Sequence, residues 1–325
     1  MTDGLEGYVL DGCLPETQEI EAPRLKLTGN VQAPRLVDLR PWCSPVEDQA
    51  TVGSCVANAV VGALEYHQIK NERPLKDLSR LFVYYNARRL GDRIGQSGTK
   101  THLALAATLG WGVCPAAMWP YQSQFVDEKP TEDCYQEAAR FKGVQVAQVG
   151  WNDGCRDALA NGLPVCFAMR VSRPDFARAR VTKELRPPEN GIWNEAGGGH
   201  AMLMVGYDDS RNAWLVRNSW GDQWADGGYV WIDYDFLDHY RSGENYREPP
   251  YVVGQIAENR AYDVTGMSLK DFVAQSTAAA PATVRSEISK MGESIASDLD
   301  QSLSKARQSI RDRLRGPGAG GGYNS

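Results

Sequence analysis

The sequence predicts an α+β fold in which a helical half comes first and antiparallel strands follow. Apolar residues recur at helical spacing over 55–70, 79–90 and 101–112, and a short amphipathic helix is expected over 132–143. From Val144 onward, apolar runs and alternating positions are typical of strands. A chain of 325 residues can bury a large core, so the two halves could face each other across a cleft.

The first 35 residues form an irregular, acidic stretch that contains glycine and proline and has no sustained period. We interpret residues 1–35 as an N-terminal arm that lies on the main domain or covers part of it. Residues 36–43 read as an extended segment or strand that enters the main domain, which we expect over 36–262.

The strand half is expected to contain an apolar strand near 163–171 and a long loop over 172–199 that ends in three glycines. Two strands, 200–207 and 213–219, are joined by DDSR and predict a hairpin. Residues 229–237 indicate another strand.

The C-terminal part of the chain changes composition after about Tyr262. Residues 263–283 are rich in Ala, Ser, Thr and Pro and predict a linker. Residues 284–315 predict one amphipathic helix with a narrow apolar stripe, and 316–325 a flexible Gly-rich end. The stripe could pack on the domain, self-associate as a coiled coil, or dock on another protein or a membrane surface. We expect 284–325 to be dispensable for catalysis and to serve assembly or localisation.

Composition excludes several classes of protein. The net charge of −6 argues against nucleic-acid binding, and no apolar run is long enough to span a bilayer. The N-terminus lacks the pattern of a signal peptide, which predicts a cytoplasmic protein or export by a signal-peptide-independent route. Seven cysteines without a CxxC pair predict no metal site and no disulfide framework, although Cys114 and Cys134 could bridge after export. No cofactor is expected.

Cys55 stands at the first turn of the predicted helix that begins PVEDQATVGSC. Unpaired backbone N–H groups and the positive end of the helix dipole favour a thiolate there. Because the thiolate is the reactive form of cysteine, Cys55 is a candidate nucleophile. The competing interpretation is a small apolar residue at the start of a core helix.

A nucleophilic cysteine needs a base, and the chain has 4 histidines. His67 lies about 18 Å along the same helix, at 1.5 Å per residue, and cannot reach Cys55. His102 opens a helix without an obvious partner, and His239 sits among charged residues. His200 remains: it follows three glycines, which allow close approach of another chain, and begins an apolar strand.

The predicted hairpin gives His200 a partner. If the two strands pair so that the numbers of opposite residues sum to about 418, His200 faces Asn218. The Asn218 side chain would then fix the tautomer of the imidazole. Trp220 could then shield that hydrogen bond from water. Gln49, six residues before Cys55, could join the Cys55 backbone N–H as an oxyanion hole.

Three segments, QATVGSC, GGHAMLMVGYD and VRNSWGDQWADGGYVWI, resemble the active-site segments of papain-like cysteine peptidases. DLRPWCSPVEDQ resembles the start of the mature domain, and GWGVCPAAMWPYQ resembles a segment in the form seen in bacterial members. The resemblance covers about residues 36–250. It implies the two-lobed papain-like fold, with a helical lobe, an antiparallel β lobe and a cleft between them.

The resemblance also implies roles for individual residues. Cys55 would be the nucleophile, His200 the general base, Asn218 the orienting residue and Gln49 the oxyanion donor. The substrate cleft would be lined by Gly98, Ala168, Gly199, Ala201 and Trp220.

The chain departs from the family pattern at four positions near the active-site segments. Val56 replaces the usual aromatic residue after the nucleophile, and Val52 stands where secreted members have a disulfide cysteine. Ala50 and Ala225 replace glycines. The arm is much shorter than the family's inhibitory propeptide, so a cleavable prodomain is not expected, although the arm could still cover the cleft.

Three hypotheses for function follow. The first is an endopeptidase that hydrolyses protein or peptide substrates through an acyl-enzyme. The second is another acyl transfer on the same fold, such as deamidation, transpeptidation or removal of a protein modifier. The third is an inactive binding module.

Overall fold

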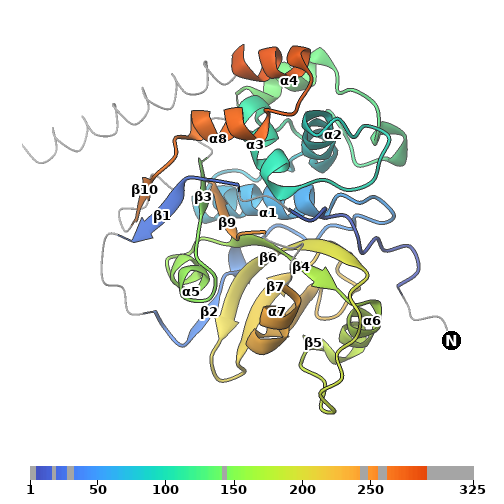
Figure 1. The fold of residues 1–325 in the computed structure, drawn as a ribbon, viewed down its shortest axis with the longest axis vertical. Coiled ribbons are helices and arrows are strands. Elements are labelled where there is room, and N and C mark those ends of the chain that lie inside the picture. Colours follow the sequence, from blue (N-terminus) through green and yellow to red (C-terminus); the bar gives the residue numbers. More distant parts are fainter. Residues whose placement is uncertain are drawn as a thin grey trace, which may run out of the picture.

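A computed structural model of the chain describes residues 5–16, 20–27, 33–140, 145–241, 248–254 and 262–290. The helical half and the strand half lie on opposite sides of one long buried helix (Figure 1). The helices are α1 (Cys55–Lys70), α2 (Arg80–Leu90), α3 (Thr101–Trp111), α4 (Glu132–Ala138), α5 (Asp153–Ala160), α6 (Arg173–Thr182), α7 (Tyr234–Arg241) and α8 (Leu269–Ser276).

The strands within the described residues form one mixed, mostly antiparallel sheet in the order β10-β1-β3-β9-β4-β6-β7-β8-β5, with β2 paired to β6. Their bounds are β1 (Arg24–Leu27), β2 (Leu36–Asp38), β3 (Gln145–Gln148), β4 (Val165–Val171), β5 (Glu184–Leu185), β6 (Gly198–Asp208), β7 (Ala213–Arg217), β8 (Tyr229–Asp233), β9 (Tyr251–Gly254) and β10 (Tyr262–Thr265). The helices expected from the sequence in the first half are present, and α1 ends at Lys70 as predicted.

Helix α1 is buried on every side because it packs between the two halves. Its residues from Cys55 to Gln68 are all buried, and most are apolar or small. A helix that is apolar all round has no solvent face, which matches a position between two layers. The first turn of this helix therefore lies where the two halves meet.

The strand half departs from the sequence-based expectation at two segments. The strand expected over 229–237 ends at Asp233, and α7 begins at Tyr234. Residues 172–199 are not a plain loop: they contain α6 and β5 and end in the start of β6. Ser172 caps α6 by accepting a hydrogen bond from the Asp175 amide. The helix has little apolar periodicity and buries mainly Phe176 and Ala179, which explains why its sequence did not indicate a helix.

The linker expected over 263–283 is wrong for the structure, which has β10 and α8 in that range. Ser268 caps α8, and Phe272 is fully buried against the helical half. Leu269 and Val273 are partly buried beside Phe272, so a short apolar face is enough to pack α8 on the helical half. Because this segment is rich in Ala, Ser, Thr and Pro, its composition did not indicate the strand and the helix that it forms.

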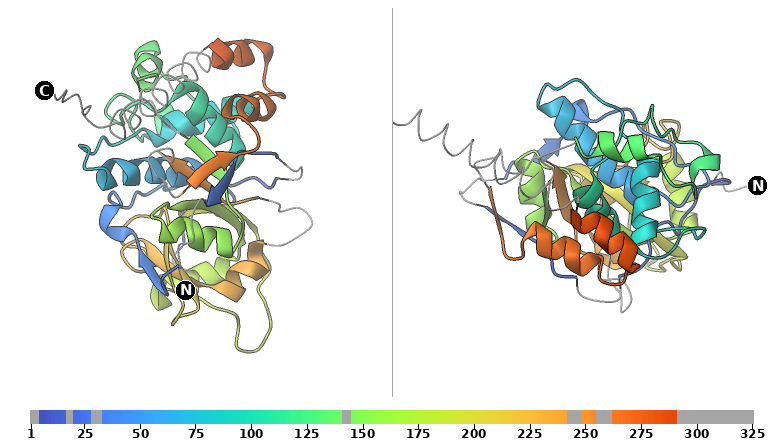
Figure 2. Two further views of the ribbon diagram at one scale, coloured as in Figure 1. Left: turned by 90° about the vertical axis from the view of Figure 1, so that its left-hand side faces the viewer. Right: turned by 90° about the horizontal axis from the view of Figure 1, so that it is seen from above.

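A further helix begins at residue 282 and is described to residue 290, so the helix expected over 284–315 is only partly within the described residues. Its Val284 and Ile288 are buried, and Ile288 packs against Gly110 of α3. Figure 2 shows this helix and α8 laid against the helical half. Of the three roles left open for the stripe, its first turns therefore pack on the domain; the Gly-rich stretch 316–325 lies outside the described residues.

All seven cysteines are free thiols in the structure, including Cys114 and Cys134. Within the described residues no helix is both long and apolar enough to cross a bilayer.

Candidate active site

The turn before Cys55 is held by a small polar network. The Asn58 side chain donates to the Ser54 carbonyl at 3.1 Å and to its hydroxyl at 3.0 Å. The Tyr121 hydroxyl lies 2.6 Å from the Ser54 hydroxyl and donates to the Gln49 carbonyl at 3.1 Å. These bonds fix the backbone from Gln49 to Ser54 against the helix start, so the first turn of α1 presents Cys55 in one orientation. Tyr121 was not identified from the sequence, because nothing local links it to residue 49.

Cys55 is completely buried in this structure. Its sulfur accepts a hydrogen bond from the Ala201 amide at 3.4 Å, so the thiol lies beside the backbone of His200. Burial raises the pKa of Cys55 to about 12, which outweighs the lowering effect of the Ala201 and Val56 amides. The helix start alone predicted a thiolate; the structure instead holds a neutral thiol because water is excluded from it.

His200 and Asn218 form the second part of the site. The His200 Nε2 and the Asn218 side-chain oxygen are 2.7 Å apart, and that oxygen also accepts from the Ser219 amide at 2.8 Å. An amide oxygen only accepts, so Nε2 carries the proton and Nδ1 is left as a basic lone pair. Nδ1 is buried and has no hydrogen-bond partner among the described residues.

Burial also governs the imidazole. It lowers the pKa of His200 to about 4, although the bond to Asn218 works in the opposite direction. The Trp220 ring lies 4.9 Å from the His200 ring and packs against it. Both the thiol and the imidazole are therefore neutral while the site is closed.

The hairpin register differs from the one predicted. Leu203 is opposite Arg217, so paired numbers sum to 420 rather than about 418, and a bulge between Met204 and Gly206 shifts the next pairs further. His200 and Asn218 are consequently not a directly opposed pair. They still meet because side chains on diagonal positions of neighbouring strands are within reach of each other.

Gln49 is buried and held at three points. Its amide nitrogen donates to the Val52 carbonyl at 2.9 Å, and its side-chain oxygen accepts from the Ser219 hydroxyl at 2.5 Å. Its backbone N–H donates to the Ser219 carbonyl at 2.8 Å. Ser219 thus joins Gln49 to Asn218, and it was missed in the sequence because it stands between two more conspicuous residues.

The N-terminal arm passes directly over Cys55. The Cys13 amide donates to the Gly199 carbonyl at 2.9 Å, while the Leu14 amide donates to the Thr99 carbonyl at 2.9 Å and the Thr99 amide to the Gly12 carbonyl at 3.1 Å. The arm therefore bonds to both halves, and in Figure 1 its blue trace runs between them. A Cβ on Gly12 would lie 2.9 Å from the Cys55 sulfur, so only glycine fits here. We call residues 8–14 the strap.

Of the residues expected to line the substrate cleft, Gly98, Trp220 and Gly199 lie against the strap and are thus positioned to face a bound chain. Gly98 adjoins the strap, since a Cβ there would lie 3.2 Å from the Asp11 and Gly12 carbonyl oxygens. Trp220 stacks on Tyr8, with ring centroids 4.9 Å apart. The Gly199 carbonyl binds Cys13, as described above.

Ala201 and Ala168 are less directly involved. The Ala201 amide binds Cys55, and its side chain is buried. Ala168 is its partner in the β4–β6 pair and is fully buried, with no contact to the strap among those described. Thr99, whose backbone bonds to Gly12 and Leu14 of the strap, was not among the expected residues.

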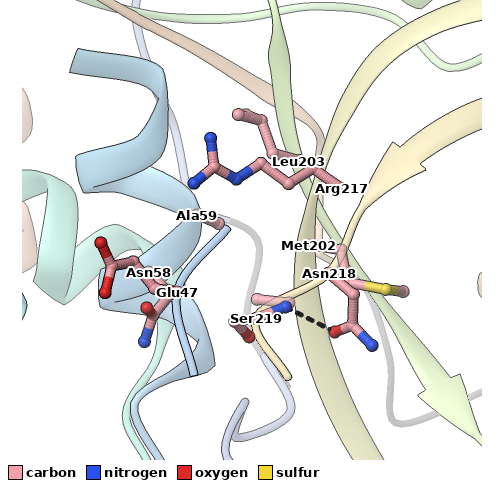
Figure 3. Close-up of a pocket in the computed structure, with 9 residues that line it drawn as sticks. Glu47, Asn58, Ala59, Met202, Leu203, Arg217, Asn218 and Ser219 are labelled. Carbon is pink, nitrogen blue, oxygen red and sulfur yellow. Dashed lines mark hydrogen bonds between the residues drawn. The ribbon is translucent and has the colours of Figure 1, made fainter. Parts of the chain in front are cut away.

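A small cavity lies between α1 and the β6–β7 pair (Figure 3). It is lined by Glu47, Asn58, Ala59, Ala201, Met202, Leu203, Arg217, Asn218 and Ser219. Above it, the buried Arg217 guanidinium donates to the Ser44 carbonyl at 2.9 Å and to the Pro45 carbonyl at 2.5 Å. Arg217 thereby ties the strand that ends at Asn218 to the segment that leads to Cys55.

This fold and this site define a class: a two-lobed α+β protein with a thiol, an imidazole and an amide gathered where the lobes meet. Residues 33–243 match the family model described as papain family cysteine protease. The chain belongs to the papain family, which confirms the resemblance and the expected fold, and it is a cysteine-type peptidase.

Individual relatives agree with that assignment. The chain is 29% identical over 255 residues to an uncharacterized peptidase C1-like protein of Acanthamoeba polyphaga mimivirus, covering 72% of this chain and 79% of the relative. It is 28% identical over 208 residues to cathepsin K of Gallus gallus, covering 61% of this chain and 58% of the relative.

Among solved structures, xylellain, a cysteine protease from Xylella fastidiosa, has a TM-score of 0.67 at 28% identity, over 76% of this chain and 96% of xylellain. Digestive procathepsin L 3 of Tenebrio molitor has a TM-score of 0.56 at 17% identity, over 75% of this chain and 76% of that chain, and supports the fold alone.

Proposed function

We propose that the chain is an endopeptidase that hydrolyses peptide bonds through an acyl-enzyme on Cys55. The observation that carries the proposal is the fixed His200–Asn218 pair at 2.7 Å, which leaves Nδ1 without a hydrogen-bond partner among the described residues, while the Cys55 sulfur is bonded to the amide of the next residue, Ala201. In this mechanism Nδ1 takes the thiol proton as the sulfur attacks the substrate carbonyl. The protonated imidazole then gives that proton to the leaving amine, and water releases the acyl group.

The charge that develops on the carbonyl oxygen needs donors that are already in place. The Cys55 backbone N–H at the start of α1 and the Gln49 side-chain N–H₂ are suited to this, because Val52 and Ser219 hold the Gln49 amide from both ends. The Gln49 nitrogen has a second hydrogen that the bond to Val52 does not use.

The described state is latent in this proposal. A peptide cannot reach Cys55 while Gly12 lies against its sulfur, and exclusion of water keeps the thiol neutral. Activity therefore requires the strap to leave. Departure hydrates both groups, which allows the thiolate–imidazolium pair to form.

The test is covalent labelling by an epoxide-type thiol inhibitor, with the modified residue identified by mass spectrometry. We expect labelling at Cys55 in the parent protein and none in Cys55→Ala. Tyr8→Ala removes the stack on Trp220 and should speed labelling and peptide turnover about tenfold, because an aromatic pair and its burial contribute about 1–2 kcal/mol. Glu6→Ala, an exposed change in the same arm, should have no effect. Turnover by Cys55→Ala would overturn the nucleophile assignment.

For the C-terminal segment we retain a role in assembly or localisation only beyond residue 290, since 284–290 is engaged with the domain. The cytoplasmic or exported location, and the identity of the peptide substrate, stay predictions from the sequence.

A further inference from the structure

A compact group of charged side chains holds the arm just beyond the strap. Glu16, which is almost fully buried, reaches the start of α3 from the arm. One of its oxygens is 3.2 Å from the Lys100 ammonium, and the other is 2.9 Å from the His102 Nδ1. Glu16 follows Gly12 by four residues, so this contact anchors the part of the arm that covers Cys55.

A second carboxyl group shares this site. Glu248 precedes β9 and is buried, and its carboxyl group meets the Thr101 side chain at the start of α3. Burial raises the pKa of Glu248 to about 8, and the charge of Glu16 raises it too, whereas Thr101 and Lys100 lower it. On β9, burial raises the pKa of Tyr251, and the charge of Glu248 raises it too.

The site therefore holds two carboxyl groups, one ammonium and one imidazole, in surroundings that exclude water. Lys100 can balance one carboxylate. A second carboxylate in the same low-dielectric site is repelled by the first and has no cation of its own. Of the two, only Glu16 can leave, because it is carried on the arm.

We propose that the strap covers Cys55 only while Glu248 is neutral, and that ionisation of Glu248 releases the arm. We call Glu16, Lys100, His102 and Glu248 the latch. Glu248 ionises as pH rises, and its repulsion of Glu16 displaces the arm and, with it, the strap. The latch rests on the proposed function only in that the covered thiol is the nucleophile. Docking of the strap can be measured without turnover.

The sign of the effect follows from linkage. The docked arm raises the pKa of Glu248, so docking takes up a proton. Docking is therefore strongest below the pKa that Glu248 has in the released state, weakens by up to about tenfold per pH unit as pH rises from there toward about 8, and changes no further above that value. The arm is released on the alkaline side, and acid holds the enzyme closed.

The experiment is hydrogen exchange of the Cys13, Leu14 and Thr99 amides in full-length Cys55→Ser protein, which cannot process itself. These amides make the bonds between the strap and the two halves. After correction for intrinsic exchange rates, we expect their protection to fall at least about tenfold between pH 6 and pH 8. In Glu248→Gln, which cannot ionise, protection should stay high and flat over this range. An equal fall in Glu248→Gln would overturn the latch, whatever the outcome of the labelling test.

His102 needs its own control, because its ring contacts Glu16 directly. In His102→Gln the pH dependence should persist. If it disappears there and persists in Glu248→Gln, His102 is the sensor and the proposal fails.

A third variant covers the case in which Glu248→Gln does not fold. Thr101→Val removes a hydroxyl that favours the Glu248 anion while keeping the shape of the side chain. It should move the loss of protection to higher pH. An unmoved or lowered midpoint contradicts the proposal.

Discussion

Cys55 and His200 are both fully buried beneath the strap, and burial moves their pKa values in opposite directions. The thiol keeps its proton and the imidazole stays neutral, so covering the site inactivates the pair chemically as well as sterically. Helix position alone would have predicted a reactive thiolate. The effect of water exclusion is larger at this residue than that of the helix start.

Asn218 offers a direct test of how the imidazole is positioned. In a Tyr8→Ala background, which loosens the strap, Asn218→Ala should lower kcat/KM about ten- to hundredfold, since a hydrogen bond to a charged group contributes about 1.5–3 kcal/mol. The exposed Asn190→Ala serves as the control. Steady-state turnover of a peptide substrate is the measurement, and an unchanged kcat/KM would remove Asn218 from the mechanism.

Ala50 and Ala225, which stand in place of family glycines, both have a positive φ, of 47° and 48°. An alanine in this left-handed region is strained, whereas glycine is not. Ala50→Gly should therefore raise the free energy of unfolding by about 0.5–1 kcal/mol, measured by denaturant titration. Ala117→Gly, at an exposed turn residue without a positive φ, should lower it instead. A loss of stability in Ala50→Gly would show that the turn is not strained.

At the scale of elements, segments from both ends of the chain complete the domain. β1 of the arm pairs with β10, and α8 and the helix from residue 282 cover α3. Arg89 of α2 also binds Glu287 at 2.8 Å. The helical half is thus built partly from residues that follow the strand half in the sequence.

Ile288 tests whether this cover belongs to the folded core. Ile288→Ala should lower the free energy of unfolding by about 2–4 kcal/mol, because it leaves a cavity against Gly110. Ser289→Ala, exposed on the next residue, should change it by less than about 0.5 kcal/mol. Denaturant titration gives both values. Equal values for the two variants would mean that the helix from residue 282 is only a tether.

For the molecule as a whole, a buried network joins the segment before α1 to both halves. Glu65 accepts from the Ser44 hydroxyl at 2.6 Å and from Arg80 at 2.8 Å, while Arg217 of β7 donates to the Ser44 carbonyl. The Arg80 and Glu65 side chains are 4% and 1% exposed, so water can replace neither partner.

Glu65→Gln should accordingly lower the free energy of unfolding by about 3–5 kcal/mol, since it leaves the Arg80 charge buried without its main partner. Asp77→Asn alters a second contact of Arg80, at 3.1 Å, but Asp77 is 66% exposed. Exposed pairs contribute about 0–1 kcal/mol, so this control should have little effect. Thermal and denaturant unfolding measure both, and similar losses in the two variants would argue against a buried pair.

The sequence by itself determined the helix of Cys55, the choice of His200 among four histidines, and the motifs that identify the family. Each depends on local spacing or on residue type, which a single stretch of chain displays. Only the tertiary structure decided the hairpin register, because the bulge at Met204–Gly206 has no local signature. It also decided the strap over Cys55, the folded segment after residue 262, and the meeting of Glu16 with Glu248. These features depend on burial and on contacts between residues far apart in the chain, and the same side chains would behave differently in water.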